Sequence, residues 1–153
     1  MSLRKTPLRL VAALSVLLAL GACEPQDRRP GLWLSGELQP YPDDWSFTDE
    51  HREIAVQVAA PYFLPHSVTI ICAALEGDLF VAAYRPETKN WPAWVTDDPN
   101  VVLKIGEHLY EARLNRVEDP LMIASALGAY AAKYRQTGSI PTSIWFWRVG
   151  PRA

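Results

Sequence analysis

The chain of 153 residues contains only two cysteines, Cys23 and Cys72, and no Cys-x-x-Cys pair. Its three histidines, His51, His66 and His108, lie far apart and without the spacing of metal ligands. We therefore expect no metal site. If Cys23 is covalently modified, Cys72 is the only free thiol and no intrachain disulfide can form.

Signatures of common catalytic sites are also missing. The sequence has no Gly-x-Ser-x-Gly elbow and no glycine-rich phosphate loop. Ser67 follows His66 directly, and adjacency in sequence does not make two side chains face each other. Two acidic pairs, Asp43-Asp44 and Asp97-Asp98, each lie next to a proline. Solvated turn residues explain these pairs better than acid–base catalysis does.

No apolar run in the N-terminal region reaches the roughly 20 residues that a membrane-spanning helix needs. Residues 10–20 form an apolar run of 11 residues that only Ser15 interrupts, and Arg4, Lys5 and Arg9 precede it. A positive segment followed by a short apolar run is typical of a secretory signal peptide.

Gly21 and Ala22 lead directly from this run into Cys23. The arrangement resembles the lipobox of bacterial lipoproteins, in which a peptidase cuts before the cysteine and acyl chains such as palmitate are attached to it. The resemblance implies a signal peptide over 1–22, lipidation at Cys23 and a place in the bacterial cell envelope, facing the periplasm. Glu24 after the cysteine slightly favours the outer membrane. The alternative is an ordinary cleavable signal with a cysteine nearby.

The mature chain would then comprise a spacer over 23–31 and one domain over 32–153. The whole chain has 15 basic and 17 acidic residues. Three of the basic residues fall in the signal peptide, so 12 face 17 acids and the mature net charge is −5. A negative chain is a poor partner for nucleic acid or anionic lipid headgroups. Attachment to a membrane would depend on acyl chains instead.

Hairpins dominate the rest of the pattern. The expected elements are a strand over 31–39, a helix over 48–60, strands over 67–75 and 79–84 around Glu76-Gly77-Asp78, a short helix, strands over 101–105 and 108–117 around Gly106-Glu107, a helix over 120–135 capped by Asp119 and stopped by Gly138, and a strand over 143–149. This order predicts an α+β fold with a small barrel of antiparallel strands.

Cys72 lies in an apolar run and is either a reactive thiol or a small buried residue. No charged neighbour in sequence lowers the pKa of its thiol, which favours the buried residue.

The stretch 89–114 contains a Pro-Ala-Trp helix at 92–94, an Asp-Pro-Asn-Val turn at 98–101, a hairpin on Ile-Gly and a Tyr-Glu-Ala-Arg strand. These pieces resemble the split-β-barrel flavin-binding superfamily, which includes pyridoxamine-phosphate-oxidase-like proteins and deazaflavin-dependent nitroreductases. The resemblance covers about 67–134. It implies a split β-barrel with two to three helices. It also implies a homodimer, in which the partner chain would cover the apolar helix 121–132.

The resemblance also implies a cofactor, either flavin mononucleotide (FMN) or a deazaflavin. Arg85 and Lys89 would meet its phosphate, and Trp91 or Trp94 would flank its ring. The alternatives are solvated loop cations and tryptophans that pack the end of the barrel. One departure matters: the relatives carry a phosphate motif rich in glycine and basic residues where this chain has residues 63–67, Phe-Leu-Pro-His-Ser.

Two functions therefore remain open. One is a membrane-tethered oxidoreductase in which the cofactor performs the electron chemistry. The other is a non-catalytic cell-envelope lipoprotein that binds a small ligand or a protein partner.

Overall fold

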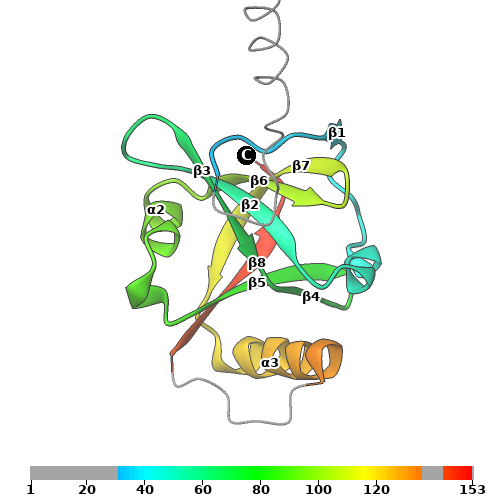
Figure 1. Cartoon of the computed structure of the whole chain (residues 1–153). Helices are drawn as coiled ribbons and strands as arrows, with labels where there is room; N and C mark the ends of the chain where they lie inside the picture. Colours follow the sequence, from blue (N-terminus) through cyan, green and yellow to red (C-terminus); the bar gives the residue numbers. More distant parts are fainter. Residues whose placement is uncertain (1–30, 136–142, 153) are drawn as a thin grey trace, which may run out of the picture.

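Eight strands form one sheet that curls into a barrel (Figure 1). The structure is a computed structural model and describes residues 31–135 and 143–152. Its elements are β1 Glu37–Gln39, the 3-10 helix η1 Ser46–Glu50, β2 Ile54–Ala59, β3 Pro65–Ile70, β4 Cys72–Leu75, β5 Asp78–Tyr84, the 3-10 helix η2 Pro86–Thr88, α2 Trp91–Asp97, β6 Asn100–Ile105, β7 His108–Val117, α3 Pro120–Tyr134 and β8 Ile144–Gly150. The expected signal peptide, Cys23 and residues 24–30 of the spacer lie outside the described residues. Among the described helices, none has the length and apolar character that crossing a bilayer requires.

The order of the strands explains how the sheet becomes a barrel. The sheet runs β3-β2-β6-β7-β8-β5-β4, with the short β1 added in parallel beside β7. All other pairs are antiparallel. The two edge strands, β3 and β4, follow each other in sequence with only Ile71 between them. The chain itself therefore joins the two edges. The α+β fold of antiparallel strands is confirmed.

Two groups of buried side chains lie on the two faces of the curled sheet. One group fills the barrel and includes Val56, Leu103 and Trp147, and the other lies under α3 and includes Phe80 and Tyr130. Strand β8 contributes to both groups, because Trp147 points into the barrel while Phe146 packs under α3. This alternation agrees with the two faces that the sequence predicts for the last strand.

The helix predicted over 48–60 is wrong. Only Ser46–Glu50 is helical, as a 3-10 turn, and β2 lies in the sheet between the edge strand β3 and β6. Ile54 and Val58 fit a helical spacing of four, but Val56 between them is also fully buried. Three buried β-branched residues at every second position are typical of a strand.

Two expected strands also have different bounds. The run 67–75 is divided at Ile71: β3 pairs with β2, and β4 pairs with β5. A continuous apolar run hides such a division, because its residues are buried whichever neighbour they pair with. At the N-terminal end of the domain, only Glu37–Gln39 of the predicted strand 31–39 is a strand. Gly31, at the end of the expected spacer, already forms a bridge with Ser67.

Helix α3 begins as the sequence predicts. The carboxylate of Asp119 accepts hydrogen bonds from the backbone N–H groups of Leu121 and Met122 at 3.4 and 3.1 Å. The helix ends at Tyr134, while Gly138, its predicted stop, lies outside the described residues. Its apolar side packs on the sheet of its own chain, yet Leu121 is 78% exposed. The predicted homodimer stays a prediction.

Candidate functional site

Arg85 and Lys89, the predicted phosphate ligands, lie at the two ends of η2, between β5 and α2. Both side chains are exposed. Arg85 adopts the left-handed conformation (φ 48°), and its backbone N–H donates to Ser143 O at 3.0 Å. The Lys89 ammonium donates to the carbonyl oxygen of Tyr84. Glu87 lies between them and accepts a hydrogen bond from the hydroxyl of Ser143 at 3.0 Å. The two cations therefore share the loop with an acid and do not form an uninterrupted positive site.

The two predicted ring-binding tryptophans, both on α2, pack on the same barrel core but make different ring contacts. Trp91 is only 4% exposed and packs inside the barrel against Trp147, with 5.0 Å between ring centroids. Its position matches the packing alternative. Trp94, one turn further along α2, is only partly buried, and its ring makes edge contacts with the rings of Tyr62 and His66, with 5.8 and 5.2 Å between ring centroids. These two residues belong to the connection between β2 and β3 and to β3 itself, so Trp94 joins α2 to that hairpin.

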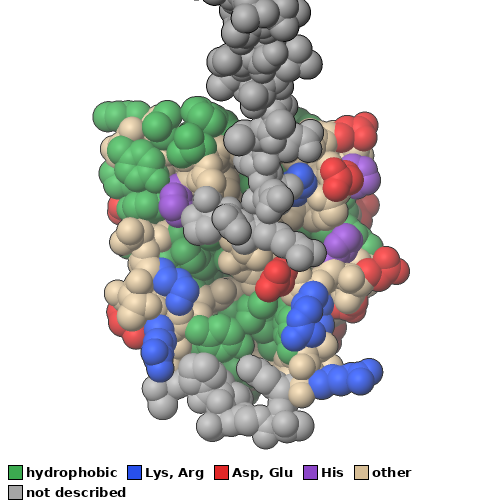
Figure 2. Space-filling view, viewed as in Figure 1, with side chains coloured by type: hydrophobic (Ala, Val, Ile, Leu, Met, Phe, Trp, Pro, Cys, Tyr) green, Lys and Arg blue, Asp and Glu red, His purple; other side chains and the backbone are tan. Residues whose placement is uncertain are grey.

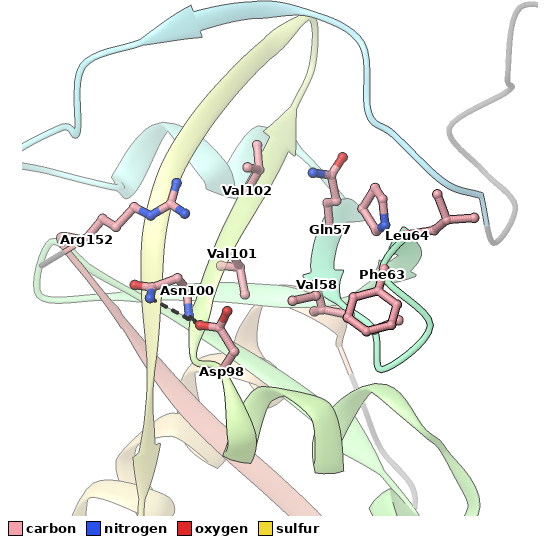
Figure 3. A pocket seen from close by; sticks show the side chains of 12 residues that line it. Gln57, Val58, Phe63, Leu64, Asp98, Asn100, Val101, Val102 and Arg152 are labelled. Carbon is pink, nitrogen blue, oxygen red and sulfur yellow. Dashed lines mark hydrogen bonds between the residues drawn. The ribbon is translucent and has the colours of Figure 1, made fainter.

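The β2–β3 hairpin borders a cavity that the sequence reasoning missed. This cavity, here called the hairpin cleft, has a volume of about 380 Å³, within the range of small-molecule pockets. Its lining comes from β2, the hairpin tip, the start of β6 and the C-terminal Arg152 (Figure 3). A second cavity of about 270 Å³ shares Ala59, Ala60 and Asp98 with it and extends to Trp94. The missed signal is the uncharged stretch around Tyr62, Phe63 and Leu64, which the predicted helix ending at Pro61 obscured.

The hairpin cleft is apolar at one end and polar at the other. Phe63 and Leu64 lie at the hairpin end, whereas Arg152 approaches from the opposite end (Figure 3). The Arg152 guanidinium is 2.6 Å from the Glu111 carboxylate. Asp98 accepts hydrogen bonds from the backbone and side-chain nitrogens of Asn100 at 3.0 and 3.1 Å. Most of the cleft's charge is therefore already engaged within the protein. The arrangement fits a ligand with an apolar body and a polar group that both donates and accepts hydrogen bonds.

Cys72 and its surroundings do not form a reactive site. The thiol is fully buried, as the sequence favours. Lys133 lies near it in space, with Nζ 3.6 Å from Sγ, but also donates to Thr48 O at 2.8 Å. Burial raises the pKa of Cys72 more than Lys133 lowers it. A thiol with a raised pKa is a weak nucleophile. Within the described residues, no group of three or more His, Cys, Asp or Glu side chains is arranged to hold a metal ion.

A phosphorylated flavin fits these residues poorly. Arg85, Lys89 and Trp91 line neither the hairpin cleft nor its neighbour at Trp94, nor two further cavities of about 580 and 470 Å³ that described residues form. Phe63, Leu64 and Pro65, at the position where the resemblance implies a phosphate motif, form an apolar wall of the hairpin cleft. A phosphate dianion needs charge-assisted hydrogen bonds. Neither the loop of Arg85 and Lys89 nor the hairpin cleft combines unpaired cations with a cavity for the flavin ring.

Comparison with solved structures identifies the architecture. A candidate pyridoxamine 5'-phosphate oxidase from Listeria innocua superposes with a TM-score of 0.54 at 14% identity, covering 69% of this chain and 87% of that one. A conserved hypothetical protein from Mycobacterium tuberculosis gives a TM-score of 0.57 at 15% identity, covering 75% and 86%. The chain has the split-barrel fold. A candidate 5-nitroimidazole antibiotic resistance protein from Bacteroides thetaiotaomicron also shares it, with a TM-score of 0.54 at 12% identity over 69% of this chain and 75% of that one.

At these identities the likeness concerns the fold alone. No protein-family model matches the chain, and no curated protein matches it either. Function must therefore be argued from the hairpin cleft and from the N-terminal sequence.

Proposed function

We propose that this protein is a lipid-anchored binding protein of the bacterial cell envelope. Its hairpin cleft would take a small molecule with an apolar body and a hydrogen-bonding head. The observation that carries the proposal is the chemical asymmetry of the cleft, with Phe63 and Leu64 at one end and Asp98, Asn100 and Arg152 at the other.

The tether in this proposal is Cys23, supported by the sequence of residues 1–23. Seven residues, from Glu24 to Pro30, separate that cysteine from Gly31, where the described domain begins. Because an extended chain spans at most about 3.3–3.6 Å per residue, the domain would stay within about 30 Å of the membrane. Two or more acyl chains hold such a protein stably in a bilayer.

A second candidate function is redox chemistry with a flavin or deazaflavin. The split-barrel fold and the two exposed cations Arg85 and Lys89, close in sequence to Trp94, favour it. When bound, the cofactor would supply the electron chemistry, and the chain would hold its phosphate with Arg85 and Lys89. The poor fit of these residues as one site places this function second.

Nuclear magnetic resonance titration of the mature protein separates the two functions. Benzamide, a soluble aryl amide, should shift the amide signals of Asn100 and Val102, and Val102→Trp should remove this response by narrowing the cleft. FMN and a deazaflavin are titrated in parallel. If either cofactor binds, and Arg85→Ala and Lys89→Ala each weaken that binding about tenfold as the loss of a charge-assisted hydrogen bond requires, the second function is correct. Binding in the hairpin cleft is contradicted if benzamide shifts signals all over the surface and Val102→Trp does not change these shifts.

The tether has its own test. Cys23→Ser should move the protein from the membrane fraction to the periplasmic fraction or leave an uncleaved precursor, and it should abolish incorporation of labelled palmitate. Normal processing with unchanged membrane partition would contradict lipidation.

A further inference from the structure

Large apolar side chains are exposed together at the tip of the β2–β3 hairpin and beside it. Phe63 is 99% exposed, and Tyr62 and Leu64 on either side of it are 48% and 43% exposed. Leu32 and Trp33, from the first described segment, are 43% and 59% exposed. We call these five residues the tip patch. Figure 2 shows hydrophobic side chains gathered at the upper left of the molecule, where Figure 1 has the hairpin.

Hydrogen bonds attach the N-terminal part of the tip patch to the hairpin. Gly31 exchanges two backbone hydrogen bonds with Ser67, at 2.9 and 2.8 Å. The Ser67 hydroxyl donates to Leu32 O at 2.5 Å, and the backbone N–H of Leu34 donates to Oε1 of Gln57 on β2 at 2.7 Å. Residues 31–34 are therefore attached to the hairpin at its Gln57–Ser67 pair, so both parts of the patch are carried by the same hairpin.

The tip patch is formed by stretches without charge. No Asp, Glu, Lys or Arg occurs in residues 54–75 or in residues 31–36. Asp97, Asp98 and Arg152 line the two cavities that the hairpin borders. A protruding surface with several exposed large apolar residues and no charge is unusual for a protein in water alone.

We infer that the tip patch is a membrane-contacting surface, which inserts into the interface of the phospholipid bilayer that holds the acylated Cys23. The choice of a bilayer as occupant rests on the proposed tether. The first described residue, Gly31, is bridged to Ser67 of this hairpin, so a lipid anchor with only seven residues between it and Gly31 would bring this part of the molecule to the membrane.

The chemistry of the tip patch suits the bilayer interface. Tryptophan and tyrosine have an apolar body and a polar atom, and they favour the level of the headgroups, while Phe63 at the apex can reach the acyl boundary. Shallow insertion of about 5–10 Å is sufficient for such contacts. The mature chain is negatively charged, so the contact depends on apolar burial rather than on attraction to anionic headgroups.

The experiment uses the mature, acylated protein reconstituted into vesicles of phosphatidylethanolamine and phosphatidylglycerol. An environment-sensitive fluorophore is attached at Phe63→Cys or, as a matched control, at Leu121→Cys. Leu121 is also a large exposed apolar residue, 78% exposed, but it lies on α3 at the opposite end of the molecule (Figure 1). Cys72 is buried and does not compete for the label. Accessibility is measured with a nitroxide-labelled phospholipid and with iodide in the water.

At position 63 we expect blue-shifted emission, with lipid-borne quenching at least about twofold stronger than at position 121 and weaker quenching by iodide. Equal accessibility of the two positions to iodide, in protein that the Cys23→Ser comparison shows to be anchored, overturns the membrane contact and leaves the tether intact. A label at position 63 shielded from both quenchers, with disulfide cross-links between unlabelled Phe63→Cys chains, assigns the tip patch to a second copy and also overturns it. Failure of the tether appears separately, as unchanged fractionation of Cys23→Ser.

Discussion

The β2–β3 and β6–β7 hairpins are adjoining parts of one sheet, because β2 pairs with β6, yet their ends are built differently. The β6–β7 turn consists of Gly106 and Glu107, both exposed. Gly106 has a φ of 58°, a conformation that glycine adopts without strain. Every feature of this turn is explained by folding and solubility.

The β2–β3 connection runs from Ala60 to Leu64 and has no such explanation. Phe63 adopts a φ of 63°, where a bulky side chain is disfavoured, and its ring is almost fully exposed. Neither the backbone conformation nor the solvent favours phenylalanine at this position. The comparison teaches that the sequence of the β2–β3 tip has a purpose other than folding, which agrees with a surface that meets another phase.

The largest expected effect tests whether the tip is independent of the core. Trp147 is 1% exposed inside the barrel, and Trp147→Ala should lower the free energy of unfolding by about 3–5 kcal/mol. Phe63→Ala should change it by less than about 0.5 kcal/mol, because a solvated side chain loses no burial. Urea denaturation of both variants measures the difference. A loss above about 1.5 kcal/mol for Phe63→Ala would mean that the tip stabilises the fold, and the contrast between the hairpins would fail.

A smaller loss of unfolding free energy is expected from removing a tyrosine hydroxyl, and two hydroxyls can be compared: one under α3 and one at the tip. The buried hydroxyl of Tyr130 lies 3.0 Å from both Ile71 O and Phe80 O. Tyr130→Phe should lower the free energy of unfolding by about 1–3 kcal/mol, since buried carbonyl groups lose their donor. Tyr62 bonds His66 at 3.1 Å in an exposed position, so Tyr62→Phe serves as the control with a change below about 0.5 kcal/mol.

The free energy of unfolding should also depend on pH through the buried tyrosines. Burial raises the pKa of Tyr130 well above its usual range and that of Tyr134 to about 12. In the unfolded chain, tyrosines lose their protons near pH 10. The folded state therefore holds more protons than the unfolded state above that pH, and stability falls as the pH rises from about 10 towards 12. Tyr130→Phe should make this fall shallower, as urea denaturation at several pH values measures. Equal slopes for wild type and Tyr130→Phe would contradict the role of burial.

The fold was predictable where short-range patterns determine it. Glycine turns identified the β4–β5 and β6–β7 hairpins, and Asp119 with Pro120 identified the start of α3. Prediction failed at β2, where residues spaced by four also fit one face of a strand. It failed again at Ile71, where pairing with distant strands divides one apolar run.

The candidate site was less predictable because it depends on contacts between distant residues. Trp91 and Trp94 are three residues apart, yet one lies in the barrel against Trp147 and the other meets the hairpin. The hairpin cleft unites residues from Gln57 to Arg152. The available signal was local: a run from residue 54 to residue 75 without Asp, Glu, Lys or Arg.

The smallest expected effect addresses residue 63 itself. Asparagine tolerates the left-handed conformation better than phenylalanine does, and an exposed ring contributes no packing. Phe63→Asn should therefore leave the free energy of unfolding unchanged or raise it by up to about 0.5 kcal/mol, with Phe63→Ala as the control that keeps the backbone strain. Thermal and urea unfolding measure both variants. A clear loss of stability in Phe63→Asn would show that the ring makes folding contacts. Unchanged or higher stability would mean that phenylalanine occupies this position against the preference of its own backbone, as expected of a residue that serves contact with a membrane.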